Sequence, residues 1–419
     1  MALAKSNRRV RAFLPLVLSA VAAAQPPSPS VRTPPQSAVL AAGSHLQVRL
    51  LTAVSSAKSR AGDPVSAVLT VDAAATAAGL VVPAGTVIRG VIRQATPFSW
   101  SAPPAVLALD FRELVRPSGP AIALTARVVA VDNARETVDG GGRILGLTPP
   151  RQAPSSGPSG DEDALRLAAV VPEVYDLAAF SIRELERPDI VYGPGTDLVL
   201  ETLAPTPDVP ASEPRAEAAP DMGLIALAAA QPARTMAGTP ARPADVINLV
   251  FSATDDELSG AFAAAGWNTA AALSLRADAR TVLAVAESRA YKPGPVSLQS
   301  WTGRPPDRVF QKQNNTFDRR HHVRVWRAAQ THGGKPVWAA SATHDVGIKF
   351  ARAERTFTHR VEADIDLERR KIVDDLRFAG VLERSAFARR VGIPATLTNA
   401  TGDAMKTDGR VAVLVLRRP

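Results

Sequence analysis

The feature that most constrains this chain is a polar–apolar alternation in short runs, each bounded by turn-forming residues. In residues 45–50 (HLQVRL) every second residue is apolar, and the same alternation returns in residues 107–111 and 122–128. A period of two places the apolar side chains on one face of a half-buried strand. The spacing therefore predicts an all-β domain, a sandwich or a barrel, over residues 43–204. A Gly-, Pro- and Ser-rich stretch at residues 140–163 predicts a long loop inside it.

The first 24 residues have the pattern of a signal peptide. Four basic residues (Lys5, Arg8, Arg9 and Arg11) precede an apolar run that ends in alanines at positions 22–24. This run is shorter than the roughly 20 residues that a membrane-spanning helix needs. We therefore expect cleavage before Gln25, a flexible leader over residues 25–42 and a periplasmic or secreted protein with no transmembrane span after signal removal. A retained N-terminal anchor is the alternative.

Composition narrows the classes of partner. The chain contains no cysteine, which excludes disulfides, thiolate metal sites and a lipid attached to cysteine. Its formal net charge of +9 becomes +5 when the four basic residues of the signal segment are subtracted. Such a mild charge argues against nucleic-acid binding, which needs a basic stripe with stacking aromatic residues. The partners we expect are another envelope protein or an anionic ligand.

The second half of the chain predicts a different domain. Residues 205–242 are Pro- and Ala-rich without an apolar period, which is typical of a disordered linker. An α+β domain is expected over residues 243–419, opening with a buried strand at residues 245–251. Thr254 then caps a helix that Gly266 ends, and a closing helix is expected to begin near Asp366. Residues 321–326 form a strand with His321, Val323 and Val325 on one face and His322, Arg324 and Trp326 on the other.

This second domain resembles the LssY C-terminal domain family over residues 243–380. An ordered series of motifs carries the resemblance: INLVF at 247–251, AAGW at 264–267, PVS at 295–297, FQK at 310–312, RHHVRVW at 320–326, PVW at 336–338, DVGI at 345–348, TH at 358–359 and ER at 368–369. Members are bacterial domains without an assigned reaction, often joined to membrane segments and sometimes to a type-2 phosphatidic-acid phosphatase. This chain lacks the histidine signatures of that phosphatase, and Pro120 stands where its Pro-Ser-Gly motif needs histidine.

A shorter resemblance lies in the N-terminal domain. Residues 62–65 (GDPV) and 81–90 (VVPAGTVIRG) resemble strand phrases in the β domains of TrbI-like conjugal-transfer scaffolds. Because such phrases are common among β turns, we favour the interpretation that this is a small β domain used for interaction.

Five of the six histidines lie between residues 321 and 359, the one polar concentration that suggests a site. Imidazole suits both proton transfer near neutral pH and metal binding. The catalytic candidates are His321, His322, Asp345 and His359, and the anion-binding candidates are Arg320 and Arg324. The metal candidates are His322, His359, Asp364 and Asp366. Adjacent strand residues point to opposite faces, so His321 and His322 are not expected to share one metal ion.

Structural interpretations compete with these functional ones. The histidines and arginines also fit a hydrogen-bonded polar face, and Asp364 and Asp366 fit the capped first turn of a helix. No known nucleophile, phosphate-binding or dinucleotide motif occurs in the sequence. We therefore expect a non-catalytic binding or scaffold module of the cell envelope. The alternative is a histidine-dependent hydrolase, with or without a metal, acting on anionic or phosphate-bearing substrates, and the sequence leaves enzymatic activity and any cofactor open.

Overall fold

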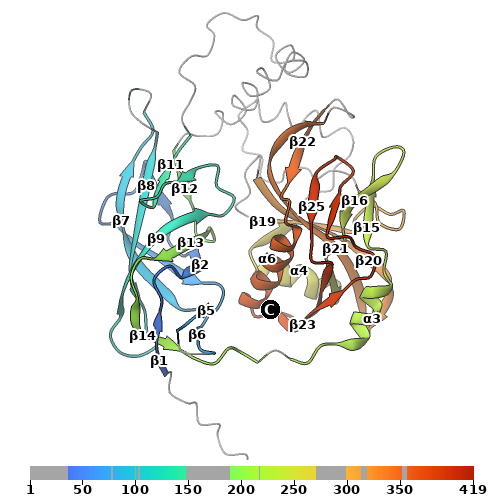
Figure 1. Cartoon of the computed structure of the whole chain (residues 1–419), viewed down its shortest axis with the longest axis horizontal. Helices are drawn as coiled ribbons and strands as arrows, with labels where there is room; N and C mark the ends of the chain where they lie inside the picture. The colour runs from blue at the N-terminus through green and yellow to red at the C-terminus, as the bar shows by residue number, and fades with distance from the viewer. Residues whose placement is uncertain are drawn as a thin grey trace, which may run out of the picture. The chain divides into compact units, whose positions relative to one another are not determined.

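The alternating runs of the N-terminal domain form a closed β-barrel, one of the two predicted architectures (Figure 1). The computed structural model describes residues 36–76, 79–99, 101, 104–147, 189–216, 218–269, 299–312, 319–351 and 356–419. The barrel sheet runs in the order β8-β7-β4-β2-β13-β9, and β9 pairs with β8 to close it. These strands are β2 (His45–Leu50), β4 (Pro64–Leu69), β7 (Val87–Thr96), β8 (Val106–Leu114), β9 (Ile122–Val131) and β13 (Asp197–Thr202).

The apolar side chains of the predicted alternation fill the core of the barrel. Leu46, Val48 and Leu50 are buried in its core, as one face of a strand requires. Gly90 marks a register shift where β7 crosses β8, and a Cβ atom there would lie 2.1 Å from the backbone oxygen of Asp110. Only glycine allows the two backbones to approach so closely.

Short strands complete the N-terminal domain. The pair β10 and β11 extends the barrel sheet from β8, while β3 pairs with β12 and β5 pairs with β6. Their bounds are β3 (Val54–Ser55), β5 (Ala73–Ala74), β6 (Val81–Val82), β10 (Thr137–Val138), β11 (Arg143–Leu145) and β12 (Val191–Tyr192). β11 lies inside the predicted loop at 140–163, and the rest of that loop from residue 148 lies outside the described residues, as does the predicted signal segment.

Two segments predicted to lack structure contain strands. β1 (Gln36–Leu40), in the predicted leader, pairs with β14 (Thr206–Ala211), in the predicted linker. The expected absence of structure does not hold here, because Leu40 and Val209 are fully buried in the barrel core and strand pairing satisfies the backbone. Further along the predicted linker lie three more elements: α3 (Met222–Ala230), β15 (Arg234–Ala237) and β16 (Arg242–Val246).

The C-terminal domain is built on a mixed sheet in the order β18-β19-β20-β21-β17-β26-β23, with β22 paired to β21. Only the β17–β26 pair of this sheet is parallel among the described strands. The strands are β17 (Leu249–Ser252), β18 (Trp267–Thr269), β19 (Arg308–Lys312), β20 (Arg319–His332), β21 (Lys335–Ala351), β22 (Thr356–Val361), β23 (Leu382–Arg389) and β26 (Arg410–Leu416). A separate pair, β24 (Thr396–Thr398) and β25 (Ala404–Lys406), lies before β26.

Helices cover both faces of this sheet. α4 (Asp255–Ala264) and α6 (Ile365–Phe378) pack on one face, where Phe262, Ile372 and Leu376 join sheet residues in one core. α3 packs on the other face through Leu224 and Ala228. The predicted N-terminus of α4 is confirmed, because Thr254 and Glu257 form a reciprocal capping box.

The two predicted faces of residues 321–326 are confirmed. Val323 and Val325 lie in the core beneath α4 and α6, whereas Trp326 lies in the opposite core with α3. β20 and β21 form a long hairpin, and β21 continues as one strand from Lys335 to Ala351.

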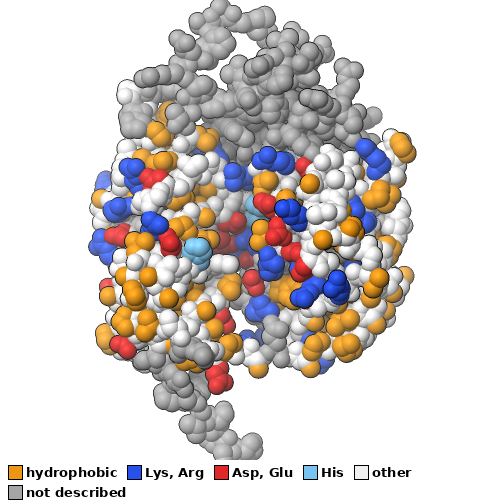
Figure 2. Space-filling view, viewed as in Figure 1, with side chains coloured by type: hydrophobic (Ala, Val, Ile, Leu, Met, Phe, Trp, Pro, Cys, Tyr) orange, Lys and Arg blue, Asp and Glu red, His pale blue; other side chains and the backbone are white. Residues whose placement is uncertain are grey.

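Among the described residues, none of the helices has the length and apolar character needed to cross a membrane. On the face shown in Figure 2, basic and acidic side chains are intermixed, with no continuous basic stripe.

Candidate functional site

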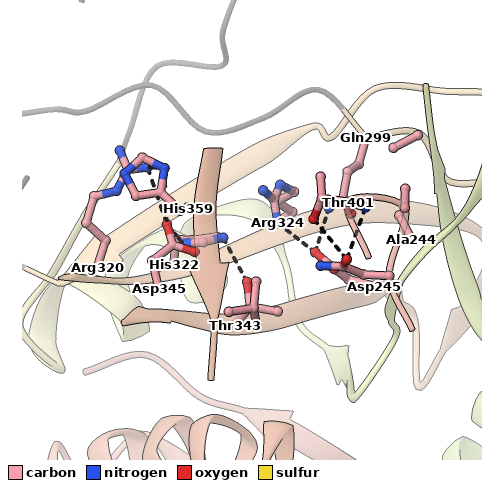
Figure 3. Close-up of a pocket in the computed structure, with 14 residues that line it drawn as sticks. Ala244, Asp245, Gln299, Arg320, His322, Arg324, Thr343, Asp345, His359 and Thr401 are labelled. Atoms are coloured by element: carbon pink, nitrogen blue, oxygen red, sulfur yellow. Dashed lines mark hydrogen bonds and ion pairs between the residues drawn. The ribbon is translucent and has the colours of Figure 1, made fainter. Parts of the chain in front are cut away.

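A polar pocket lies on the α3-side face of the C-terminal sheet (Figure 3). Strand alternation builds it: Arg320, His322 and Arg324 come from β20, and their cross-strand partners Thr343 and Asp345 come from β21. The cavity is about 90 Å³, several times what one water molecule needs. Its lining is completed by Ala237, Ala244, Asp245, Gln299, His359, Val361, Asn399, Ala400 and Thr401.

One end of the pocket joins Arg320, Asp345 and His359. The Arg320 guanidinium lies 2.9 Å from Nδ1 of His359 and 3.3 Å from the Asp345 carboxylate. Burial raises the pKa of Asp345 to about 6, although Arg320 and Arg324 act in the opposite direction. Asp345 therefore changes charge near neutral pH, beside two cationic side chains.

The other end is organised around Asp245. Oδ2 of this carboxylate accepts hydrogen bonds from Gln299 Nε2 at 2.6 Å and from Arg324 Nη1 at 3.2 Å. Its Oδ1 is buried and has no hydrogen-bond partner among the described residues. A buried carboxylate oxygen normally accepts a hydrogen bond, so this atom has unused capacity for a donor.

His322 lies between these two ends. Its Nε2 is 2.8 Å from the Thr343 hydroxyl, while its Nδ1 is buried without a hydrogen-bond partner among the described residues. Burial, reinforced by Arg324 and Arg320, holds the pKa of His322 well below its ordinary value. The ring is therefore neutral, and whichever proton state Nδ1 has, it offers one further hydrogen bond.

The structure brings together most of the predicted site residues. His322, Asp345 and His359 line the pocket with both anion-binding candidates, Arg320 and Arg324. Sequence reasoning missed Asp245, Gln299 and Thr343; Thr343 stands opposite His322 and only the strand register reveals it.

Asp364 and Asp366, the acidic metal candidates, do not line the pocket. Asp364 caps α6 by accepting from the backbone N–H of Asp366. Asp366 accepts from the Thr407 hydroxyl and from the backbone N–H of Asp408. These bonds account for both carboxylates, in agreement with the capping interpretation.

His321 lies on the opposite face of β20 and contacts the barrel. Its Nδ1 is 2.7 Å from Glu368 of α6, and its Nε2 is 3.0 Å from Asp132, which follows β9. Burial would lower the pKa of His321, but the two carboxylates outweigh it and raise the pKa to about 9. His321 is therefore an imidazolium that joins the C-terminal domain to the barrel.

Five more charged residues extend this contact. Asp375 of α6 binds both Arg49 of β2 and Lys312 of β19, with each nitrogen–oxygen distance 2.7 Å. Asp197 of β13 binds Arg49 at 2.7 Å and Lys371 of α6 at 2.9 Å. We call the full set the interdomain cluster: Arg49, Asp132, Asp197, Lys312, His321, Glu368, Lys371 and Asp375. With His321 protonated, four positive charges face four negative charges, which offsets the cost of burying them.

A metal ion has one candidate set among the described residues: His321, His344 and Glu368, whose ligand atoms lie within 4.8 Å of one another. Both ring nitrogens of His321 already contact carboxylates, and His344 Nε2 is 2.9 Å from the Asn133 side chain. The two imidazole rings are stacked, with centroids 4.0 Å apart and planes 16° apart. Lone pairs in nearly parallel rings do not converge on one point. These three side chains are therefore better arranged to share a proton than to bind a metal ion.

Comparison with solved structures finds ComB10 of the Com Type IV secretion system of Helicobacter pylori. The match has 14% sequence identity and a TM-score of 0.22, and it covers 40% of this chain and 88% of that chain. A score this low does not test the resemblance of the N-terminal domain to TrbI-like scaffolds, which stays a prediction. A comparison with curated proteins finds no match.

The protein-family comparison does bear on the C-terminal domain. The matching family is described as LssY C-terminus, and its match begins in the segment predicted as linker, at the end of α3. It covers β15 and β16, of which β16 supplies Asp245 to the pocket, so the family match starts earlier than residue 243. Residues 229–411 of this chain thus match the LssY C-terminus family, as the ordered motifs predicted.

Proposed function

We propose that this protein is an exported, non-catalytic binding module of the bacterial cell envelope, whose C-terminal domain binds a small ligand with an anionic group. The observation that carries the proposal is the convergence of Arg320, Arg324, His322 and His359 on one buried pocket. Burying a guanidinium is costly, and burial lowers the pKa of Arg324. A bound anion would offset that cost, because charge-assisted hydrogen bonds are strong in a desolvated site.

Export rests on the N-terminal segment. Its basic residues, apolar run and alanine end are the pattern of a signal peptide. An envelope protein is the partner that this location favours. N-terminal sequencing of the native protein should find a chain that starts near Gln25 in the periplasm or outside the cell; intact Met1 on a purely cytoplasmic protein would contradict the proposal.

One observation favours hydrolysis as the second candidate. Asp345, His322 and Thr343 follow the order of a carboxylate, a base and a nucleophile, with Thr343 Oγ1 2.8 Å from His322 Nε2. However, Asp345 Oδ2 is 3.7 Å from His322 Nδ1, too far for the hydrogen bond that orients a base. The geometry therefore favours ligand binding over hydrolysis.

The test is a titration of the full chain with inorganic phosphate and with acetate by isothermal titration calorimetry. We expect binding of one anion per chain, with affinity at least tenfold weaker in Arg320→Met. Arg112→Met is the matched control, since Arg112 is an exposed arginine of the barrel. Absence of binding by the parent chain would overturn the proposal.

The hydrolase alternative has its own readout. Release of nitrophenol from nitrophenyl phosphate or nitrophenyl acetate, and the metal content of the purified chain, should be measured for the parent and for Thr343→Val. Turnover by the parent that the folded Thr343→Val variant loses would replace the binding proposal with hydrolysis.

A further inference from the structure

Asp245 Oδ1 and His322 Nδ1 are buried in the pocket without a hydrogen-bond partner among the described residues, and they differ in the kind of hydrogen bond that they can make. Asp245 Oδ1 can only accept a hydrogen bond, because a carboxylate oxygen has no proton to donate. His322 Nδ1 can donate when the Thr343 hydroxyl donates to Nε2. One ligand that meets both atoms therefore needs a donor at Asp245 and an acceptor at His322.

Electrostatics decides which end of the ligand carries negative charge. Arg320 and Arg324 lie on the same face of β20 as His322, two positions away on either side, and His359 stands beside Arg320. A negative group next to His322 is attracted by Arg320 and Arg324, while Asp345, whose Oδ2 lies 3.7 Å from His322 Nδ1, opposes this attraction when it is ionised. Asp245 and Asp345 are the carboxylates among the described lining residues, and Asp345 already contacts Arg320.

The side-chain hydrogen bonds that Asp245 accepts from the described residues both reach Oδ2, so a ligand that binds at Oδ1 must be a hydrogen-bond donor. Thr235 Oγ1 donates to Gln299 Oε1 at 2.7 Å, which orients the Gln299 amide so that its Nε2 donates to Asp245 Oδ2. Arg324 donates to the same oxygen, and the Asp245 backbone N–H donates to Thr235. All of these bonds leave Oδ1 without a donor from the part of the chain that the structure describes.

The size of the cavity limits the size of the ligand. A volume of about 90 Å³ admits only a small molecule, whose two polar groups are joined by few bonds. Arg324 contacts Asp245 and lies two residues from His322 on β20, so both ends of the pocket belong to one cavity.

Resting on the proposed function of this same pocket, we propose that the ligand is a small α-amino carboxylate, bound as a zwitterion. Its ammonium group donates to Asp245 Oδ1. Its carboxylate accepts from His322 Nδ1 and faces Arg320 and Arg324.

The test compares four probes on the full chain by isothermal titration calorimetry. Glycine carries both groups, glycolate replaces the ammonium with a hydroxyl, acetate lacks it, and inorganic phosphate is an anion of different shape. We expect glycine to bind at least tenfold more tightly than glycolate or acetate. In Asp245→Asn, the affinity for glycine should fall at least tenfold while the affinity for acetate does not fall, because the variant removes a negative charge beside Arg324. Asp110→Asn, a carboxylate of the barrel, is the matched control.

The outcomes separate this inference from the function on which it rests. Binding of acetate, glycolate or phosphate as tight as that of glycine overturns the zwitterion and leaves the anion site standing. Failure of all four probes overturns both. If Asp245→Asn does not fold, the comparison of glycine with glycolate and acetate on the parent chain still decides the question.

Discussion

Arg49 in the barrel and Asp375 in the C-terminal domain form an ion pair of 2.7 Å across 326 positions of sequence. Both side chains are largely buried, and Asp375 also binds Lys312 and accepts from Trp267 Nε1. Residues 36–419 accordingly form one compact unit. The barrel and the C-terminal domain therefore stabilise each other through buried ion pairs that join one to the other.

The first prediction concerns this pair. Arg49→Met should lower the free energy of unfolding by about 3–5 kcal/mol, because it leaves three positive charges against four negative charges in the buried interdomain cluster. Urea unfolding measures the change, with Arg112→Met as the exposed control. The double variant Arg49→Met/Asp375→Leu should recover part of the loss, and strictly additive losses would show that the two side chains are not coupled.

The second prediction is a pH dependence of stability that arises from His321. Its folded pKa of about 9 lies above the ordinary 6.5, so the folded chain binds this proton more tightly than the unfolded chain. The stabilisation is complete below pH 6.5 and is lost as pH rises through 9. The melting temperature should fall over that window, and the fall should be much shallower in His321→Gln. An equal slope in parent and variant would contradict the assignment.

The third prediction concerns anion binding and Asp345. As pH falls from 7.5 to 5.5, protonation of this carboxyl near its pKa of about 6 removes a negative charge beside Arg320. Acetate affinity should rise several-fold over that range, while His322 stays neutral. In Asp345→Asn the affinity should be high throughout and nearly independent of pH. Weaker binding at pH 5.5 than at 7.5 by the parent would be the opposite result.

The fourth prediction tests the strand in the predicted leader. Leu40 is fully buried, so Leu40→Ala should destabilise the chain by about 2–5 kcal/mol through lost burial and a cavity. Leu51→Ala is the control, because that side chain is 49% exposed. Chemical denaturation of both variants gives the comparison, and equal small effects would mean that β1 does not belong to the barrel.

The features that depend only on neighbouring residues could be predicted from the sequence. Thr254 as a cap and the opposite faces of His321 and His322 follow from spacing alone, and both are confirmed. The strands β1 and β14 were missed because each is short and Pro-containing or flanked by proline, and each is stabilised by a partner that is far away in sequence. Composition within a window carries no information about such a partner.

The residues of the candidate site also fall into two groups: those that are close in sequence and could be predicted, and those that only the fold brings together. His322 and Arg324 could be grouped from one strand, and Asp345 and His359 were close enough in sequence to be included. Asp245 reaches Arg324 from 79 positions away, and Asp132 reaches His321 from 189 positions away. Neither carboxylate stands in a motif, so only the folded chain shows them.

The adjacency of His321 and His322 has a consequence for how this strand tolerates change. Deleting one residue of β20 ahead of them would reverse the inside and outside of the strand, moving the imidazolium into the pocket and the neutral ring toward α6. The charges would then be unbalanced both in the pocket and in the interdomain cluster. Insertions and deletions in this strand should therefore be far more damaging than substitutions, and the Gly333–Gly334 turn beyond it is where length can vary without exchanging the two histidines.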